Sequence, residues 1–282
     1  GITLRVVIDG KDLTQGMELA SVSLNEKVKD EYTLHSGKKK HCSYLANKKV
    51  FTFSGKGNQD LEVIFQVSND GVAFQYRLPG MSVEASTLDK IKEATSFQLN
   101  NLQNSWLHPR AEPQTGWEKT QPSYEEHYVN ILSQHDAGPF GFTYPSLFQA
   151  KNAWILITES GLRDYNAGTH LKVFPGETEL FSIAYPDPIE YALKEPDLPE
   201  KIRNWESPWR LIILGESPAG IIESTLVTDV AIPEKKGAYI FVEPGKASWS
   251  WAMLKDEGTI YPVQKEFIDL AAEMDYQYCL ID

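Results

Sequence analysis

The sequence predicts a mostly β protein: a large antiparallel β-sandwich followed by the first βαβ unit of a (β/α)8 barrel that is incomplete within these 282 residues. Residues 1 to about 215 read almost entirely as strands and turns, with scarcely any helical period. A short helix and a polar linker follow, and the pattern then changes to strand, helix and strand. We therefore expect two domains, at residues 1–238 and 239–282.

The clearest strand signal is a hairpin at residues 61–78. Apolar residues alternate over 61–67 and again over 72–78, and Asn69-Asp70-Gly71 supplies the turn between them. Many such strands in sequence imply a large antiparallel sandwich. The other strand candidates are residues 2–8, 154–158, 171–174, 179–184 and 209–214.

The change of pattern begins at Ser217-Pro218, a good N-cap and first-turn pair for a helix. Residues 233–237 read as a polar linker. Beyond it we expect a short strand at 247–251, a helix from Pro262 and a strand at 276–281, whose nearly continuous apolar run is typical of a strand covered on both faces. A (β/α)8 barrel needs about 250 residues, so we expect the chain to be a portion of a longer protein.

Composition excludes several function classes. With 27 Lys and Arg against 39 Asp and Glu, the formal net charge is −12, and no basic stripe offers a nucleic-acid contact. No apolar stretch is long enough to predict a membrane span. The motifs of nucleotide sites, serine hydrolases and zinc sites are missing from the sequence. Carboxylates and aromatics remain, and seven Trp and thirteen Tyr suit the stacking of sugar rings, although aromatics more often fill cores.

Glu159 is the most specific candidate for a site residue. It directly follows an apolar strand and precedes a turn at Gly161, so we expect it at the rim of a sheet with its carboxylate oxygens projecting. A glutamate is a hard oxygen ligand that suits Ca²⁺. The alternative is a rim glutamate in a salt bridge or in water.

Two further stretches are candidates for contacts with a sugar. Residues 123–128, preceded by Trp106 and Trp117, read as an exposed loop and strand start with a possible cleft contact. Trp251 and Asp282 come at the ends of the two expected barrel strands. Side chains at the C-terminal ends of barrel strands face the active site, so we expect Trp251 and Asp282 to bind substrate.

Three segments, in order, resemble glycoside hydrolase family 97. They are an Ile-Thr-Glu-x-x-Leu-x-x-Tyr stretch at 157–165, a Trp-Arg-Leu-Ile-Ile strand with its following helix at 209–226, and a Pro-Gly-Lys-x-x-Trp-x-Trp stretch at 244–251 that continues through 267–269 to 278–282. The resemblance covers nearly the whole chain, although the first 100 residues match only in strand pattern. In one place the chain departs from the family: residues 166–169, Asn-Ala-Gly-Thr, stand where many relatives have Pro-Gly-Met.

The resemblance implies an N-terminal β-supersandwich before a (β/α)8 catalytic barrel. It also implies hydrolysis of terminal α-linked glucose or galactose from oligosaccharides, with Ca²⁺ at the catalytic centre. Glu159 occupies the motif of a metal ligand that the family's sandwich contributes. The family's catalytic carboxylates lie on later barrel strands, so no catalytic residue is expected in this chain. A periplasmic or secreted location is implied as well.

Two alternatives stay open. The sandwich could be a non-catalytic carbohydrate-binding module, although such a module has no need of a βαβ unit. It could also be a mutarotase-like sugar isomerase, which requires a His beside a carboxylate in a concave sheet face; His108, His127 and His170 are the candidates. The sugar, the stereochemistry of cleavage and the oligomeric state are left open by the sequence.

Overall fold

A computed structural model describes residues 1–55, 59–110, 127–130, 140–174, 177, 179–186, 201–233, 241 and 243–281. The chain divides into two compact units, one of residues 1–32 with 41–233 and the other of residues 33–40 with 234–282. The domain boundary expected at residue 239 lies in 234–240, outside the described residues, and stays a prediction.

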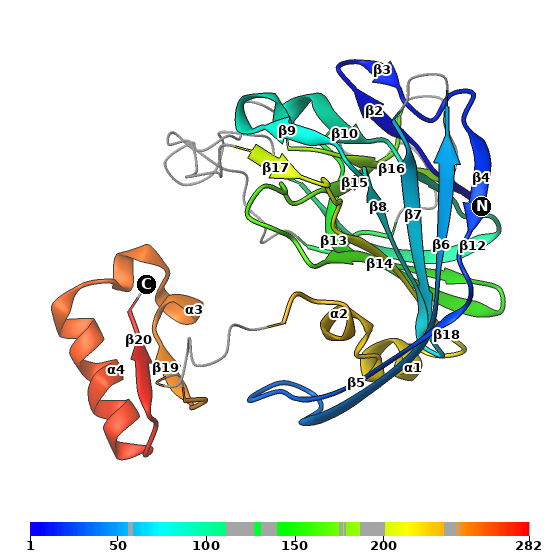
Figure 1. Cartoon of the computed structure of the whole chain (residues 1–282). Coiled ribbons are helices and arrows are strands. Elements are labelled where there is room, and N and C mark those ends of the chain that lie inside the picture. The colour runs from blue at the N-terminus through cyan, green and yellow to red at the C-terminus, as the bar shows by residue number, and fades with distance from the viewer. Residues whose placement is uncertain are drawn as a thin grey trace. The chain divides into compact units, whose positions relative to one another are not determined.

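The first unit is built on one hydrogen-bonded antiparallel sheet, as the sequence predicts (Figure 1). The strand order is β1-β11-β16-β15-β13-β14-β18-β8-β7-β6-β4, with β12 beside β13 and β5 beside β6. Its strands are β1 (Ile2–Thr3), β4 (Glu18–Val22), β5 (Glu26–Thr33), β6 (His41–Ser54), β7 (Leu61–Val67), β8 (Gly71–Arg77), β11 (Ser96–Gln98), β12 (Leu102–Pro109), β13 (Phe142–Ala150), β14 (Ala153–Ser160), β15 (His170–Lys172), β16 (Leu180–Ala184) and β18 (Trp209–Gly215).

Two smaller sheets complete this unit. One contains β2 (Val6–Ile8), β3 (Lys11–Asp12) and β10 (Ile91–Glu93); the other contains β9 (Ser82–Glu84) and β17 (Lys201–Arg203). A 3-10 turn, η1 (Ala85–Lys90), leads from β9 to β10. Every predicted strand is thus found within one or two residues, except that 2–8 is broken into β1 and β2.

The large sheet folds over on itself, which makes it a sandwich. Phe74 in β8 and Phe97 in β11 are far apart in the strand order, yet their ring centroids are 6.5 Å apart. Both belong to one buried apolar cluster that also includes Val6 and Ile91 from the small sheet. The two layers therefore share a core, as in other β-sandwiches.

Strand β18 is buried on both faces. Leu211 and Ile213 face the helices α1 (Pro218–Glu223) and α2 (Leu226–Asp229), while Arg210 and Ile212 face the sandwich core. Helix α1 begins at Pro218 after Ser217, as predicted, although the Ser217 side chain makes no capping hydrogen bond. Because β18 is covered on both faces, its sequence is a nearly continuous apolar run, and Arg210 is the charged residue within that run.

The second unit contains the predicted βαβ pattern. Strands β19 (Ala247–Trp249) and β20 (Tyr278–Leu280) pair in parallel, and α3 (Trp251–Leu254), η5 (Asp256–Gly258) and α4 (Tyr261–Glu273) connect them. Among the described residues of the chain, no helix has the length and apolarity needed to cross a bilayer.

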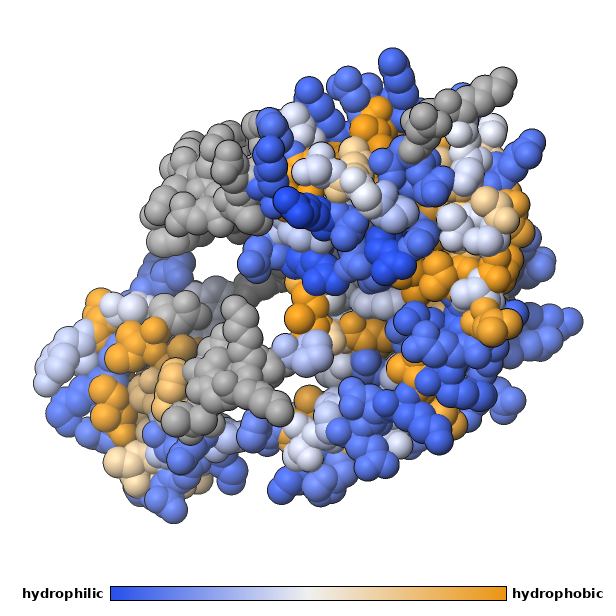
Figure 2. Space-filling model, in the orientation of Figure 1, coloured by the Kyte–Doolittle hydropathy of each residue, from blue (hydrophilic) through white to orange (hydrophobic). Residues whose placement is uncertain are grey.

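Two expectations for this unit were wrong. The first strand ends at Trp249, and Trp251 begins α3, because the N–H groups of Met253 and Leu254 both donate to the Ser250 carbonyl at 3.0 Å. The last strand is not buried on both faces: Tyr278 and Leu280 are 45% and 47% exposed. A two-stranded sheet with one long helix leaves apolar residues at the surface of this unit, where Figure 2 shows them in orange.

Gly71 tests the packing of the β7–β8 hairpin on β18. Its φ is +150°, and a Cβ there would lie 2.1 Å from the Ile212 carbonyl oxygen. We expect Gly71→Ala to lower the free energy of unfolding by about 3 kcal/mol, since the obstacle is backbone in a close-packed sheet. The measurement is urea unfolding followed by tryptophan fluorescence.

The control is Gly80→Ala. Gly80 also has a positive φ, of +72°, but a Cβ there meets nothing within 4 Å. In Gly80→Ala the free energy of unfolding should therefore fall only by the cost of the left-handed backbone conformation, about 1 kcal/mol. Equal losses in the two variants would show that the contact with Ile212 does not matter.

Candidate functional site

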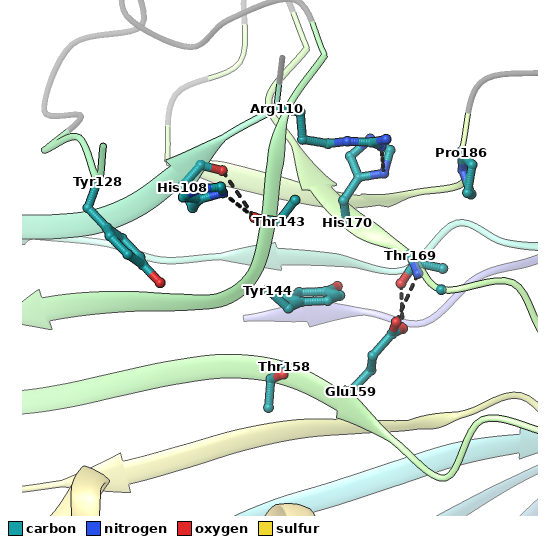
Figure 3. A pocket seen from close by; sticks show the side chains of 11 residues that line it. His108, Arg110, Tyr128, Thr143, Tyr144, Thr158, Glu159, Thr169, His170 and Pro186 are labelled. Carbon is teal, nitrogen blue, oxygen red and sulfur yellow. Dashed lines mark hydrogen bonds between the residues drawn. The ribbon is translucent and has the colours of Figure 1, made fainter. Parts of the chain in front are cut away.

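A polar pocket of about 810 Å³ opens in the sandwich unit (Figure 3). Its wall is formed by β12, β13 and β14 and by the segments around β15. That volume falls within the range typical of small-molecule sites. The lining residues are His108, Arg110, Tyr128, Thr143, Tyr144, Thr158, Glu159, Gly168, Thr169, His170 and Pro186.

Glu159 lines this pocket, but its carboxylate does not project freely. Oε1 accepts the Thr169 backbone N–H at 2.9 Å, and Oε2 accepts the Thr169 hydroxyl at 2.7 Å (Figure 3). The Arg210 guanidinium also donates to Oε2. The Glu159 oxygens therefore do not project freely, and the alternative of a glutamate in a salt bridge is the one that is found, because β14 places Glu159 directly opposite Arg210 of β18.

Arg210 bridges two carboxylates. Its side chain is only 1% exposed, and its Nε and Nη2 each lie 2.8 Å from Glu93 Oε2. Its Nη1 donates to Glu159 and, at 2.9 Å, to the Thr169 hydroxyl. Burial by itself lowers the pKa of Arg210, but Glu93 and Glu159 outweigh it and raise that pKa above its ordinary value.

Glu93 is the fully buried member of the network. Burial raises the pKa of Glu93 above its ordinary value, and the charge of Arg210 opposes that rise. Its backbone N–H donates to the Tyr185 hydroxyl at 3.1 Å. Of the two carboxylates, Glu159 is the one that reaches the pocket.

His170, which follows Thr169 in the pocket wall, is held neutral. Arg110 Nη1 lies 2.6 Å from His170 Nδ1 (Figure 3). Arginine can only donate, so the nitrogen of His170 that faces it accepts and carries no proton. Burial, together with the charges of Arg110 and Lys172, lowers the pKa of His170 to about 3.

The remaining wall offers hydroxyl and aromatic groups. His108 Nδ1 lies 2.7 Å from the Thr143 hydroxyl, and the His108 ring is 5.4 Å from that of Tyr128. The buried Tyr144 hydroxyl has no hydrogen-bond partner within the described ranges, and burial raises the pKa of Tyr144. Such groups suit the hydroxyls of a sugar better than an apolar ligand.

A calcium ion fits this pocket only in part. Among the residues that the structure describes, no three His, Cys, Asp or Glu side chains gather in a metal-binding group. Ca²⁺ takes six to eight oxygen ligands, and of the described carboxylates only Glu159 lines the pocket. The described residues of the sandwich can therefore supply one carboxylate ligand, and any others would come from outside them.

The other candidates for sugar contacts have different outcomes. Trp251 lies in the second unit, where its Nε1 donates to Asp256 Oδ1 at 2.8 Å and Lys255 Nζ stands 3.9 Å from the centre of its ring. Its role in substrate binding stays a prediction. Asp282, Trp117 and residues 123–126 lie outside the described residues.

Sequence reasoning missed most of the charge network. Arg210 stood inside an apolar strand, and a charge there requires a buried partner; that signal was available and was not used. Glu93 and Thr169 gave no comparable signal, because their contacts with Arg210 join residues 117 and 41 positions apart. Thr169 belongs to residues 166–169, the segment that departs from the family pattern. Its backbone N–H and its hydroxyl both contact Glu159.

The fold and the site together define an antiparallel β-sandwich that holds one carboxylate in the wall of a polar pocket. Residues 1–233 match the family model described as Glycosyl-hydrolase 97 N-terminal, and the chain belongs to this family of glycoside hydrolases.

Known proteins agree with this assignment. The chain is 26% identical over 283 residues to a probable retaining alpha-galactosidase of Streptomyces bingchenggensis (strain BCW-1), covering 99% of the chain and 40% of that protein. It superposes on a beta-arabinopyranosidase crystal structure with a TM-score of 0.82 and 30% identity, covering 100% of the chain and 45% of that one.

A family 97 enzyme from Pseudoalteromonas sp. strain K8, solved in complex with acarbose, shares the fold with a TM-score of 0.75 at 18% identity. The match covers 100% of the chain and 42% of that enzyme. The chain thus spans less than half the length of the relatives it matches.

Arg210 is expected to be essential for stability. Arg210→Met leaves two carboxylates facing each other without a cation, and breaking a buried ion pair in this way costs about 3–5 kcal/mol. Urea unfolding measures the loss. Arg163→Met is the control, because Arg163 pairs with Glu206 at 39% side-chain exposure, where such a pair contributes at most about 1 kcal/mol. A similar small loss for both variants would contradict the bridging role.

His170 is expected to make the sandwich unit less stable in acid. The pKa of His170 is about 3 in the folded chain and near 6.5 in the unfolded chain. The unfolded chain therefore binds more protons than the folded chain between these two pH values. Stability is therefore fully present above about pH 6.5 and falls with decreasing pH, by at most about 1.4 kcal/mol per unit for this group.

The measurement is urea unfolding between pH 4 and 7. We expect His170→Gln to have a shallower pH slope than the wild type, while the exposed His41→Gln keeps the wild-type slope. Identical slopes for His170→Gln and the wild type would contradict a neutral buried imidazole.

Proposed function

We propose that the whole protein containing this chain hydrolyses terminal α-linked galactose, or its pentose analogue β-L-arabinopyranose, from oligosaccharides. The observation that carries the proposal is the carboxylate of Glu159, fixed by Arg210 and Thr169 in the wall of a polar pocket of about 810 Å³. Membership of family 97 supplies the reaction class.

The choice of sugar rests on two relatives. One is a probable alpha-galactosidase and the other a beta-arabinopyranosidase. β-L-Arabinopyranose has the ring configuration of α-D-galactopyranose and lacks only the hydroxymethyl group. Both activities therefore require a site for the same arrangement of ring hydroxyls, which favours galactose over glucose.

The acid–base chemistry is divided between this chain and the rest of the protein. Glycoside hydrolysis requires two carboxyl groups on either side of the scissile bond. Glu159 is the one carboxylate among the described residues that line the pocket, and its two oxygens already accept hydrogen bonds from Arg210 and Thr169. We place the acid and its partner carboxylate outside this chain, and we assign orientation of the sugar hydroxyls to Tyr144, Thr143 and Thr158.

Glu159 is proposed as one ligand of a calcium ion. Bound calcium supplies positive charge that orients sugar hydroxyls and stabilises neighbouring carboxylates in their ionised form. Arg210 and Thr169 hold the Glu159 carboxylate in a fixed orientation at the pocket, where its oxygens can face a cation.

Residues 239–282 are proposed as the start of a (β/α)8 barrel, which supplies the remaining ligands and the catalytic carboxylates. The parallel pairing of β19 and β20 around α4 supports this, as do the exposed apolar residues of that unit. Trp251 and Asp282 are retained as proposed sugar contacts. An exported location is likewise retained as a proposal, on the family resemblance alone.

The two alternatives receive less support. A mutarotase-like isomerase needs a histidine that exchanges protons, but His170 faces Arg110 and is held neutral. His127 is not among the described residues that line the pocket, and His108 contacts Thr143 and Tyr128 there. A non-catalytic module has no use for the βαβ unit of the second part of the chain.

Hydrolysis by the full-length protein tests the activity. With p-nitrophenyl α-galactoside, β-L-arabinopyranoside and α-glucoside as substrates, we expect cleavage of the first two to exceed that of the third. EGTA should abolish the reaction and added Ca²⁺ should restore it. No cleavage of any of the three with calcium present would contradict the proposal.

Calorimetry of calcium binding tests Glu159 separately. Replacing one carboxylate ligand by an amide should weaken calcium binding by roughly tenfold or more, so Glu159→Gln is expected to bind Ca²⁺ more weakly than the wild type. Glu206→Gln, which removes a carboxylate outside the pocket, is the control. Unchanged calcium affinity in Glu159→Gln would remove it from the ligand set even if hydrolysis is confirmed.

A further inference from the structure

Two tryptophans form an exposed stack on the sandwich. Trp106 in β12 and Trp154 in β14 have ring centroids 5.2 Å apart and planes only 24° from parallel. Strand β13 lies between their two strands, so both rings lean over it to meet. Trp106 is 36% exposed and Trp154 is partly buried beneath it. The stacking therefore holds the indole of Trp106 in a fixed orientation with part of its surface exposed to solvent.

This stack lies beside the pocket. Trp106 is two residues before His108 in β12, across a shift in the register with β13, and His108 lines the pocket. Tyr128, which is 56% exposed, stands over the His108 ring and also lines the pocket. Val129 pairs with Leu107, so Tyr128 and Asn130 fall opposite His108 and Trp106 on the adjoining strand segment. Aromatic surface thus continues from the pocket to the tryptophan stack.

Amide side chains border the stack. Asn130 Nδ2 donates to Asn104 Oδ1 at 3.0 Å, and Asn104 Nδ2 donates to Gln149 Oε1 at 2.8 Å. Gln149 lies opposite both Asn104 and Trp154 in the sheet register. The row of amides therefore crosses three neighbouring segments next to the indole rings, and each amide offers further donor or acceptor capacity.

We propose that Trp106, supported by Trp154 and bordered by this row of amides, binds a sugar unit of an oligosaccharide beyond the unit held in the pocket. The apolar face of a pyranose ring stacks on an indole, and its hydroxyls need amide or hydroxyl partners; both are present side by side. This inference rests on the proposed function, because it assigns an additional subsite to the same pocket. The rigid stack gives up little conformational freedom when a sugar binds.

Such a subsite contributes binding without touching the reacting bond. Its loss should raise KM for long substrates and leave kcat nearly unchanged, because the contact is equally strong in the ground state and the transition state. A substrate too short to reach Trp106 should not be affected. Chain-length preference is therefore the property that separates this subsite from a structural role.

The experiment compares stachyose, an α-galactosyl tetrasaccharide, with p-nitrophenyl α-galactoside in the full-length protein. For Trp106→Ala we expect KM for stachyose to rise roughly tenfold, with less than a twofold change for the nitrophenyl glycoside. Trp106→Phe, which keeps a ring, should recover most of the difference. Leu45→Ala is the control, since Leu45 is exposed on β6, away from the pocket.

Other results decide against the proposal. Equal changes for both substrates in Trp106→Ala, or no change for either, overturn it, and the former indicates that Trp106 packs against another part of the whole protein. If the wild type cleaves neither substrate, the proposed function fails. The subsite is then decided by calorimetry of stachyose binding, where equal affinity in the wild type and Trp106→Ala overturns it.

Discussion

The guanidinium of Arg210, buried between Glu93 and Glu159, is the interaction on which the candidate site depends. Removing a charge from water is expensive, and it is tolerated only when the partners are fixed and hydrogen-bonded. Here the partners come from β10 and β14, and Thr169 before β15 donates to the same carboxylate and accepts from the same guanidinium. The network joins the small sheet to the large one and fixes the carboxylate that reaches the pocket.

The position of β18 makes this network possible. One face of the strand packs on α1 and α2 through Leu211 and Ile213, so the opposite face is turned into the sandwich core. Arg210 has no path to solvent at 1% exposure and must find its partners inside. The cost of that burial is offset by the apolar packing of its neighbours on both faces, and the result is a site that can hold its geometry before any ligand binds.

The pocket combines the fixed carboxylate of Glu159 with aromatic side chains at its border. The charged part, around Glu159, suits a cation and the polar face of a sugar, whereas Trp106 and Tyr128 offer apolar surface outside it. A division of this kind fits a protein that recognises a saccharide over more than one ring. It also fits the proposal that the sandwich assists chemistry carried out elsewhere in the whole protein.

The sequence by itself determined the class of fold, some of the strands and the identity of Glu159 as a candidate, but it did not indicate the longest strand, β6. Alternation over residues 61–78 and the long helical period after Pro262 are local properties, and local periodicity specifies secondary structure directly. Tertiary structure alone decided the surroundings of Glu159. The contacts of Glu93 with Arg210 and of Trp106 with Trp154 join residues 117 and 48 positions apart, and such contacts follow from the strand order of the sheet, which periodicity does not encode.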